Sequence, residues 1–121
     1  MKSVIFVYGS LKRGYALHGL LEKQLFMGEA ESVACGRLFD LGDYPGLVAS
    51  ESGYRVRGEL YAVTAECLAA LDGVEGVEDG VYERRRIELV SPNESISAEA
   101  YFYRLSVNGC REIGSEWHPE R

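Results

Sequence analysis

The chain has 121 residues, of which 46% are hydrophobic, and its 19 acidic and 13 basic residues give a net charge of −6. This length fits one domain, residues 1–121, which can bury about two thirds of the surface of its unfolded chain. The negative charge argues against sequence-independent binding to nucleic acid, because such binding needs a cationic surface. We therefore expect a small globular domain with no nucleic-acid partner.

Apolar runs and cysteines limit the class of protein further. No apolar run approaches the ~20 residues of a membrane-spanning helix, and the N-terminal run is too short for a secretory signal. Cys35, Cys67 and Cys110 are odd in number and form no C-x-x-C pair, so they predict neither a disulfide framework nor a metal site. We expect a cytoplasmic protein with no membrane partner, and the sequence leaves its oligomeric state open.

The first predicted element is a buried strand over residues 4–8. This run is β-branched and aromatic, too short for a helix, and ends at a glycine. Gly9 allows the backbone to turn without a Cβ clash. The N–H groups of Gly9, Ser10 and Leu11 can then form a nest for an oxygen anion, with two basic residues following to add positive potential. The simpler alternative is a glycine turn that leaves a core strand.

The following stretch mixes a helical pattern with strand formers. Apolar residues spaced three and four apart predict a helix over residues 15–25. Residues 32–41 are rich in strand formers, residues 42–46 have the composition of a loop, and a short strand opens at Leu47. Alternation over residues 54–63 predicts another strand.

The second half of the chain predicts a helix and a hairpin. Thr64 is a good N-cap for a short helix that ends near Gly73 and Gly76. After an acidic loop, residues 81–90 predict a strand and residues 98–105 its hairpin partner.

About six strands and two short helices in this order do not alternate as in a parallel sheet. They predict an α+β fold with a mainly antiparallel sheet. A sheet of this size can curl into a small β-barrel, which removes exposed edges. The polar tail from about residue 108 is a candidate flexible segment.

Glu75 is the leading candidate for chemistry. It follows the end of the predicted helix and lies next to Gly76, so glycine allows its loop to approach a ligand closely. Partial burial would raise its pKa towards neutrality and suit it to accept and return a proton. The simpler alternative is a solvated loop carboxylate, because Glu78 and Asp79 lie nearby.

Two motifs, in their order and spacing, resemble a known family. The first is YGSLKRG over residues 8–14, and the second is LDGVEG over residues 71–76 with Tyr82 downstream. The dipeptide Tyr44-Pro45 also matches and is a candidate pocket wall. Over roughly residues 4–103 the chain resembles the gamma-glutamyl cyclotransferase-like family, and it is most similar to the gamma-glutamylamine branch.

The resemblance implies a compact, partly closed β-barrel flanked by short helices, with a ligand cavity at one end. It implies that Glu75 is the general acid/base. The substrate-binding residues that it implies are Tyr8, Gly9, Ser10, Leu11 and Tyr82.

The implied substrate is a small gamma-glutamyl compound, and the implied reaction is its cyclisation. The α-amine attacks the γ-carbonyl of its own molecule and yields 5-oxoproline and a free amine or amino acid. A carboxylate takes the proton of the α-ammonium and returns it to the leaving nitrogen. Such a cyclotransferase, of acyltransferase or lyase type, needs no metal and no organic cofactor. The amine part of the substrate cannot be read, because specificity lies in variable loops.

Three other functions stay open. They are a non-catalytic protein of the same fold that binds a small anion, a different transferase or hydrolase, and a protein-interaction module.

Tyr82 fits a core strand as well as a cavity wall. Arg84, Arg85 and Arg86 are more typical of a solvated strand face than of an anion site. His18 also matches the family, yet a single helical histidine more often has a structural role.

Overall fold

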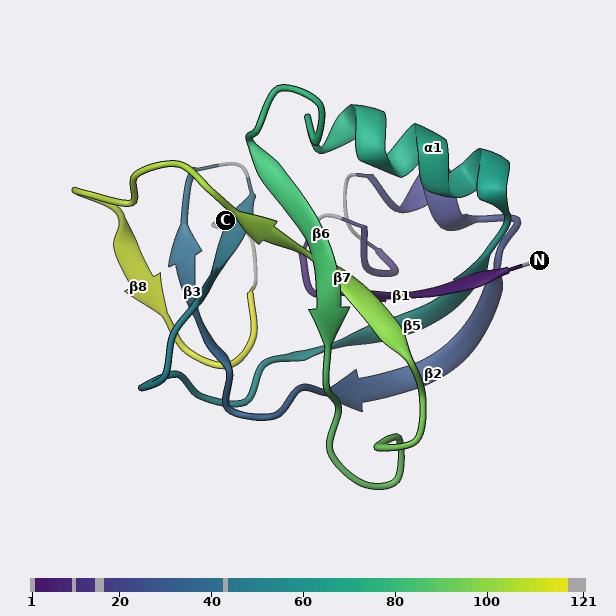
Figure 1. Ribbon diagram of the computed structural model, residues 1–121, viewed down its shortest axis with the longest axis horizontal. Helices are drawn as coiled ribbons and strands as arrows, with labels where there is room; N and C mark the ends of the chain where they lie inside the picture. The colour runs from purple at the N-terminus through teal and green to yellow at the C-terminus, as the bar shows by residue number, and fades with distance from the viewer. Residues whose placement is uncertain (1, 10, 15–16, 43, 118–121) are drawn as a thin grey trace.

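The protein is described by a computed structural model over residues 2–9, 11–14, 17–42 and 44–117. Its described strands form one curled, half-barrel sheet, with one α-helix and one 3-10 turn against it (Figure 1). The elements in chain order are β1 (Ser3–Val7), η1 (His18–Leu21), β2 (Leu25–Glu31), β3 (Gly36–Asp40), β4 (Pro45–Ala49), β5 (Arg57–Val63), α1 (Ala65–Val74), β6 (Tyr82–Ile87), β7 (Ala98–Tyr103) and β8 (Arg111–Ile113). The predicted α+β class, with a mainly antiparallel and curled sheet, is confirmed.

The strand order of the sheet is β2-β5-β1-β7-β4-β3-β8. β6 lies outside this order and pairs with β7. Most pairs are antiparallel, whereas β7 runs parallel to both β1 and β4. β7 therefore joins the two parts of the sheet, one built on β1 and β5 and the other on β3 and β4 (Figure 1). The predicted hairpin of β6 and β7 is confirmed, with Tyr82 opposite Tyr103.

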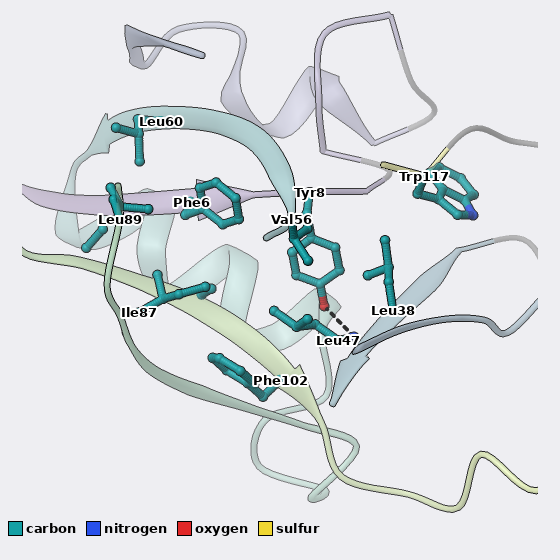
Figure 2. Packing of buried hydrophobic residues seen from close by; sticks show 12 residues of the cluster. Phe6, Tyr8, Leu38, Leu47, Val56, Leu60, Ile87, Leu89, Phe102 and Trp117 are labelled. Carbon is teal, nitrogen blue, oxygen red and sulfur yellow. Dashed lines mark hydrogen bonds between the residues drawn. The ribbon is translucent and has the colours of Figure 1, made fainter. Parts of the chain in front are cut away.

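β1 lies in the middle of the sheet and is buried on both faces. Its side chains alternate between the faces, so Phe6 and Tyr8 join one core cluster while Ile5 and Val7 join another. Burial on both faces is the reason that this strand reads as an unbroken apolar run. Figure 2 shows the first cluster inside the curl of the sheet, with Phe6 and Tyr8 among its central rings.

α1 covers the other face of the sheet and packs beside η1 (Figure 1). It begins where predicted, because the side chain of Thr64 accepts a hydrogen bond from the backbone N–H of Cys67 at 3.1 Å. Leu71 is fully buried and belongs to the same cluster as Leu21 of η1. No helix in the described part of the chain is long and apolar enough to cross a membrane.

The helix predicted over residues 15–25 is wrong. Among the described residues 17–25, His18–Leu21 form a 3-10 turn, and the chain then enters strand β2 (Leu25–Glu31), which the sequence did not predict. β2 pairs along the length of β5 with a bulge between Phe26 and Gly28. Pairing with a neighbouring strand outweighs a weak local helical pattern of this length.

Residues 111–117 of the polar tail, which the sequence marks as a candidate flexible segment, contact the sheet. β8 pairs with β3, and the carbonyl of Ser115 accepts a hydrogen bond from the N–H of Arg57 at 2.7 Å. Trp117 is only 3% exposed and packs in the cluster with Leu38 and Tyr8, at the end of the cluster shown in Figure 2. The buried indole fixes a polar segment that has few other apolar side chains.

We expect Trp117→Ala to lower the free energy of unfolding by about 3–5 kcal/mol, because it removes a large buried ring from the core. Urea unfolding followed by circular dichroism measures this loss. Leu105→Ala is the matched control, since Leu105 is 51% exposed. A loss below about 1 kcal/mol in Trp117→Ala would contradict the role of this segment in closing the core.

Candidate active site

A cavity of about 360 Å³ opens where β1 ends. It is bounded by the turn after β1, the start of β4, the C-terminal end of α1 and the start of β6, with Tyr101 of β7 at its wall. The described residues that line it are Phe6, Val7, Tyr8, Gly9, Leu11, Leu17, Tyr44, Pro45, Val74, Glu75, Gly76, Val81, Tyr82 and Tyr101.

The turn after β1 forms one end of this cavity. The carbonyl of Gly9 accepts a hydrogen bond from the N–H of Lys12 at 3.0 Å, which closes a tight turn. A Cβ on Gly9 would lie 2.7 and 2.8 Å from two ring carbons of Pro45, so only glycine fits this contact. The Nδ1–H of His18 donates to the carbonyl of Leu11 at 3.0 Å. His18 thus holds the turn from η1, which agrees with the structural role expected for it.

Glu75 is placed by the way in which α1 ends. The N–H of Gly76 bonds to the carbonyl of Gly73, and the N–H of Val77 bonds to the carbonyl of Asp72. This pair of bonds is a Schellman motif, and Gly76 occupies its left-handed position with φ of 65°. Glu75 is therefore the last helical position before the chain reverses, and its side chain lines the cavity.

Burial controls the electrostatics of Glu75. The residue is half-buried, and loss of water around the carboxyl group raises its pKa to about 7. Within the described residues its carboxylate has no hydrogen bond or ion pair that would stabilise the charge. Near neutral pH, the carboxyl group therefore exists in both protonated and ionised forms, which is the condition for accepting and returning a proton.

Three tyrosines surround Glu75, and each donates its hydroxyl proton to another part of the protein. Tyr8 donates to the carbonyl of Tyr101 at 2.6 Å and accepts from the N–H of Leu47 at 3.2 Å. Tyr82 donates to the carbonyl of Pro45 at 2.8 Å. Burial raises the pKa of all three hydroxyls well above the ordinary range, so they stay neutral. Their rings therefore form an uncharged wall.

Asp72 supports this wall from one turn earlier in α1. Its carboxylate accepts from the hydroxyl of Tyr101 at 2.7 Å and from the guanidinium of Arg84 at 2.8 Å. Arg84 also lies 3.4 Å from a carboxylate oxygen of Glu99. Arg84 is thus part of a network behind the wall, and neither Arg85 nor Arg86 lines the cavity.

We expect Asp72→Ala to lower the free energy of unfolding by about 1–3 kcal/mol, because the Tyr101 hydroxyl and the Arg84 guanidinium lose their acceptor. Chemical unfolding of the variant measures the loss. Asp79→Ala removes an exposed carboxylate of the loop that follows α1 and serves as the control, with no change above about 0.5 kcal/mol. Equal stabilities for the two variants would show that the network contributes nothing.

The positive potential expected beside the turn is not found in the cavity. Lys12 is 4% exposed and donates from Nζ to the carbonyl of Trp117 at 3.2 Å, and Arg13 approaches Glu59 and Glu29. Both side chains lie away from the described lining, in which Glu75 is the only charged residue. The described residues also contain no cluster of three or more histidine, cysteine or acidic side chains suited to a metal ion.

The sequence of this chain is similar to the sequences of known proteins. The profile of the family described as gamma-glutamyl cyclotransferase, AIG2-like, matches residues 5–119. The chain belongs to this family. A Vibrio cholerae relative is 39% identical over 76% of this chain and 76% of its own length. The gamma-glutamylaminecyclotransferase of Bos taurus is 31% identical over 82% of this chain and 63% of its own length.

Solved structures of other proteins share the fold. The Escherichia coli protein ytfP, solved by NMR, superposes with a TM-score of 0.71 at 32% identity and covers 94% of this chain and 95% of its own. A mouse AIG2-like protein superposes with a TM-score of 0.70 at 27% identity, covering 87% of this chain and 78% of its own.

Most of the site residues expected from the sequence lie together. The same cavity is lined by Tyr8, Gly9, Leu11, Glu75 and Tyr82. Ser10 lies outside the described residues. The candidate wall Tyr44-Pro45 lines the cavity as well. Tyr101 and its partner Asp72 were missed as contributors to the site. The LDGVEG motif contains Asp72, but nothing in the sequence shows that it pairs with a strand 29 residues away.

Proposed function

We propose that the protein converts a gamma-glutamyl amine or gamma-glutamyl amino acid to 5-oxoproline and the free amine. The observation that carries this proposal is Glu75, the only charged residue among the described lining, whose pKa burial raises to about 7. A proton shuttle for a reaction at neutral pH needs a group of this kind.

The mechanism assigns one role to each end of the cavity. The turn of Tyr8, Gly9, Ser10 and Leu11 holds the glutamyl moiety with backbone N–H groups, and the ring of Tyr82 packs beside it. The substrate folds so that its α-nitrogen lies close to its γ-carbonyl carbon, which makes the attack intramolecular.

Glu75 transfers one proton in two steps. Its carboxylate removes a proton from the α-ammonium, and the neutral amine attacks the γ-carbonyl carbon to form the new C–N bond of the five-membered ring. The protonated Glu75 then donates to the leaving nitrogen, the old C–N bond breaks, and the amine departs. The ring nitrogen still carries one extra proton after the attack, and it passes this proton to the departing amine, which leaves as an ammonium ion. The carboxylate is regenerated, so the cycle closes with no metal, cofactor or water consumed.

Mass spectrometry after incubation with a panel of gamma-glutamyl amines and gamma-glutamyl dipeptides tests this function. The proposal expects 5-oxoproline and the free amine in equal amounts. Glutamate in place of 5-oxoproline would indicate a hydrolase. No product from any compound, with the protein folded, would favour a small-anion-binding protein of the same fold.

The pH dependence of kcat/KM follows from the raised pKa of Glu75. Because the ionised form must accept the first proton, kcat/KM is expected to rise with pH, and the rise should level off above about pH 7. Initial rates of 5-oxoproline formation at constant ionic strength measure this curve. A rise centred near the ordinary value of 4.5 would contradict the burial of the working carboxyl group.

A further inference from the structure

We infer that the cavity selects gamma-glutamyl compounds whose amine part is apolar and uncharged, such as an alkylamine or arylalkylamine. This inference rests on the proposed function and adds the chemical class of the leaving group. It follows from the apolar rim of the cavity, defined here as Leu17, Tyr44 and Val74.

The rim residues are exposed and come from three separate segments. Leu17 precedes η1, Tyr44 precedes β4 and Val74 ends α1, and the three are 38%, 43% and 49% exposed. A single exposed apolar side chain needs no explanation. Three exposed apolar side chains that line one cavity, contributed by segments far apart in the sequence, are a feature of the kind that marks a binding site.

The position of Glu75 fixes which part of the substrate meets the rim. To protonate the leaving nitrogen, the Glu75 carboxyl group must lie within hydrogen-bond reach of it. The substituent on that nitrogen therefore begins at Glu75. Val74 is the adjacent residue and half-exposed, so the substituent leaves the interior past Val74 and contacts the rim.

The described lining offers no charged partner to a charged amine part. Besides Glu75, which the mechanism uses, no described lining residue is acidic or basic. A terminal ammonium or carboxylate on the amine part would lose water at the rim without gaining a partner there. An alkyl chain is stabilised by apolar contact with the rim instead. Each methylene that contacts the rim raises kcat/KM by about threefold to fourfold.

A matched substrate series tests the inference through the rate of 5-oxoproline formation. The series consists of gamma-glutamyl conjugates of methylamine, propylamine, pentylamine and putrescine. The pentylamine and putrescine conjugates have nearly the same shape and differ in a terminal methyl or ammonium group. We expect kcat/KM to increase from methyl to pentyl by at least about tenfold, and the putrescine conjugate to fall to the methyl level or below.

Rim variants add a readout that does not depend on absolute activity. In Leu17→Ser and Val74→Ser the ratio of kcat/KM for the pentyl and methyl conjugates should fall severalfold. In Leu105→Ser, which changes a residue that is 51% exposed and not part of the lining, the ratio should stay as in the wild type.

The outcomes separate the inference from the proposed function. Turnover of every conjugate at similar kcat/KM, or a preference for the putrescine conjugate, would overturn the inference and leave the proposed function standing. An unchanged pentyl-to-methyl ratio in both rim variants would also overturn it. No 5-oxoproline from any conjugate would overturn the proposed function, and the inference with it.

Discussion

Glu75→Gln is expected to reduce kcat by about a hundredfold to ten-thousandfold. The amide has nearly the shape of the carboxyl group but cannot accept the proton of the substrate ammonium. Steady-state rates of 5-oxoproline formation measure the loss. Glu78→Gln is the matched control, because Glu78 is exposed on the same loop and does not line the cavity. Activity near the wild-type level in Glu75→Gln would remove this residue from the mechanism.

The same variant separates loss of chemistry from loss of fold. Burial raises the pKa of Glu75 from its ordinary value of 4.5 to about 7 in the folded protein. The folded protein therefore loses stability relative to the unfolded chain as the pH rises from 4.5 through 7. Glutamine stays neutral and does not incur this loss. Glu75→Gln should therefore unfold at a higher urea concentration than the wild type at pH 8, with the difference shrinking below pH 5.

Gly9→Val is expected to lower kcat/KM by about a hundredfold and to destabilise the protein by about 1–3 kcal/mol. A Cβ at this position would lie 2.7 Å from the ring of Pro45, so the turn must move away from β4 and its N–H groups lose their positions. Substrate kinetics and urea unfolding measure the two effects. Gly19→Ala is the control, because a Cβ there meets nothing within 4 Å.

A second substitution tests whether Pro45 is the cause. Gly9→Ala should lower kcat/KM and stability in the wild-type background. It should lower them much less in the Pro45→Ala background, since the smaller side chain at 45 leaves room for the new Cβ. A double-mutant cycle expresses this coupling. Independent effects of the two substitutions, or normal substrate binding in Gly9→Val, would show that the close approach of the turn to β4 is not needed.

The parts of the site predicted from the sequence are those set by local chemistry. A glycine directly after a buried strand predicts a turn, and Gly76 after Glu75 predicts the end of a helix with a carboxyl group beside it. Both predictions depend on a few adjacent residues. For this reason the cavity contains Gly9 and Glu75 where the motifs placed them.

The parts that the sequence did not predict depend on contacts between distant segments. Residues 25–31 form a strand that pairs along β5, whereas the sequence showed only a helical spacing of apolar residues up to Leu25 and predicted no strand here. Trp117 stands in a polar tail and is buried only because the curled sheet leaves space beside Leu38. Lys12 follows the turn after β1 in sequence, but its side chain extends towards Trp117 and does not line the cavity.

Isotope analysis of the product tests the central claim most directly. A gamma-glutamyl alkylamine with ¹⁵N in its α-amine is incubated with the protein in H₂¹⁸O, and the products are analysed by mass spectrometry. Cyclisation by intramolecular attack predicts 5-oxoproline that contains the ¹⁵N and no ¹⁸O. Glutamate that contains ¹⁸O would show attack by water, and would contradict the account.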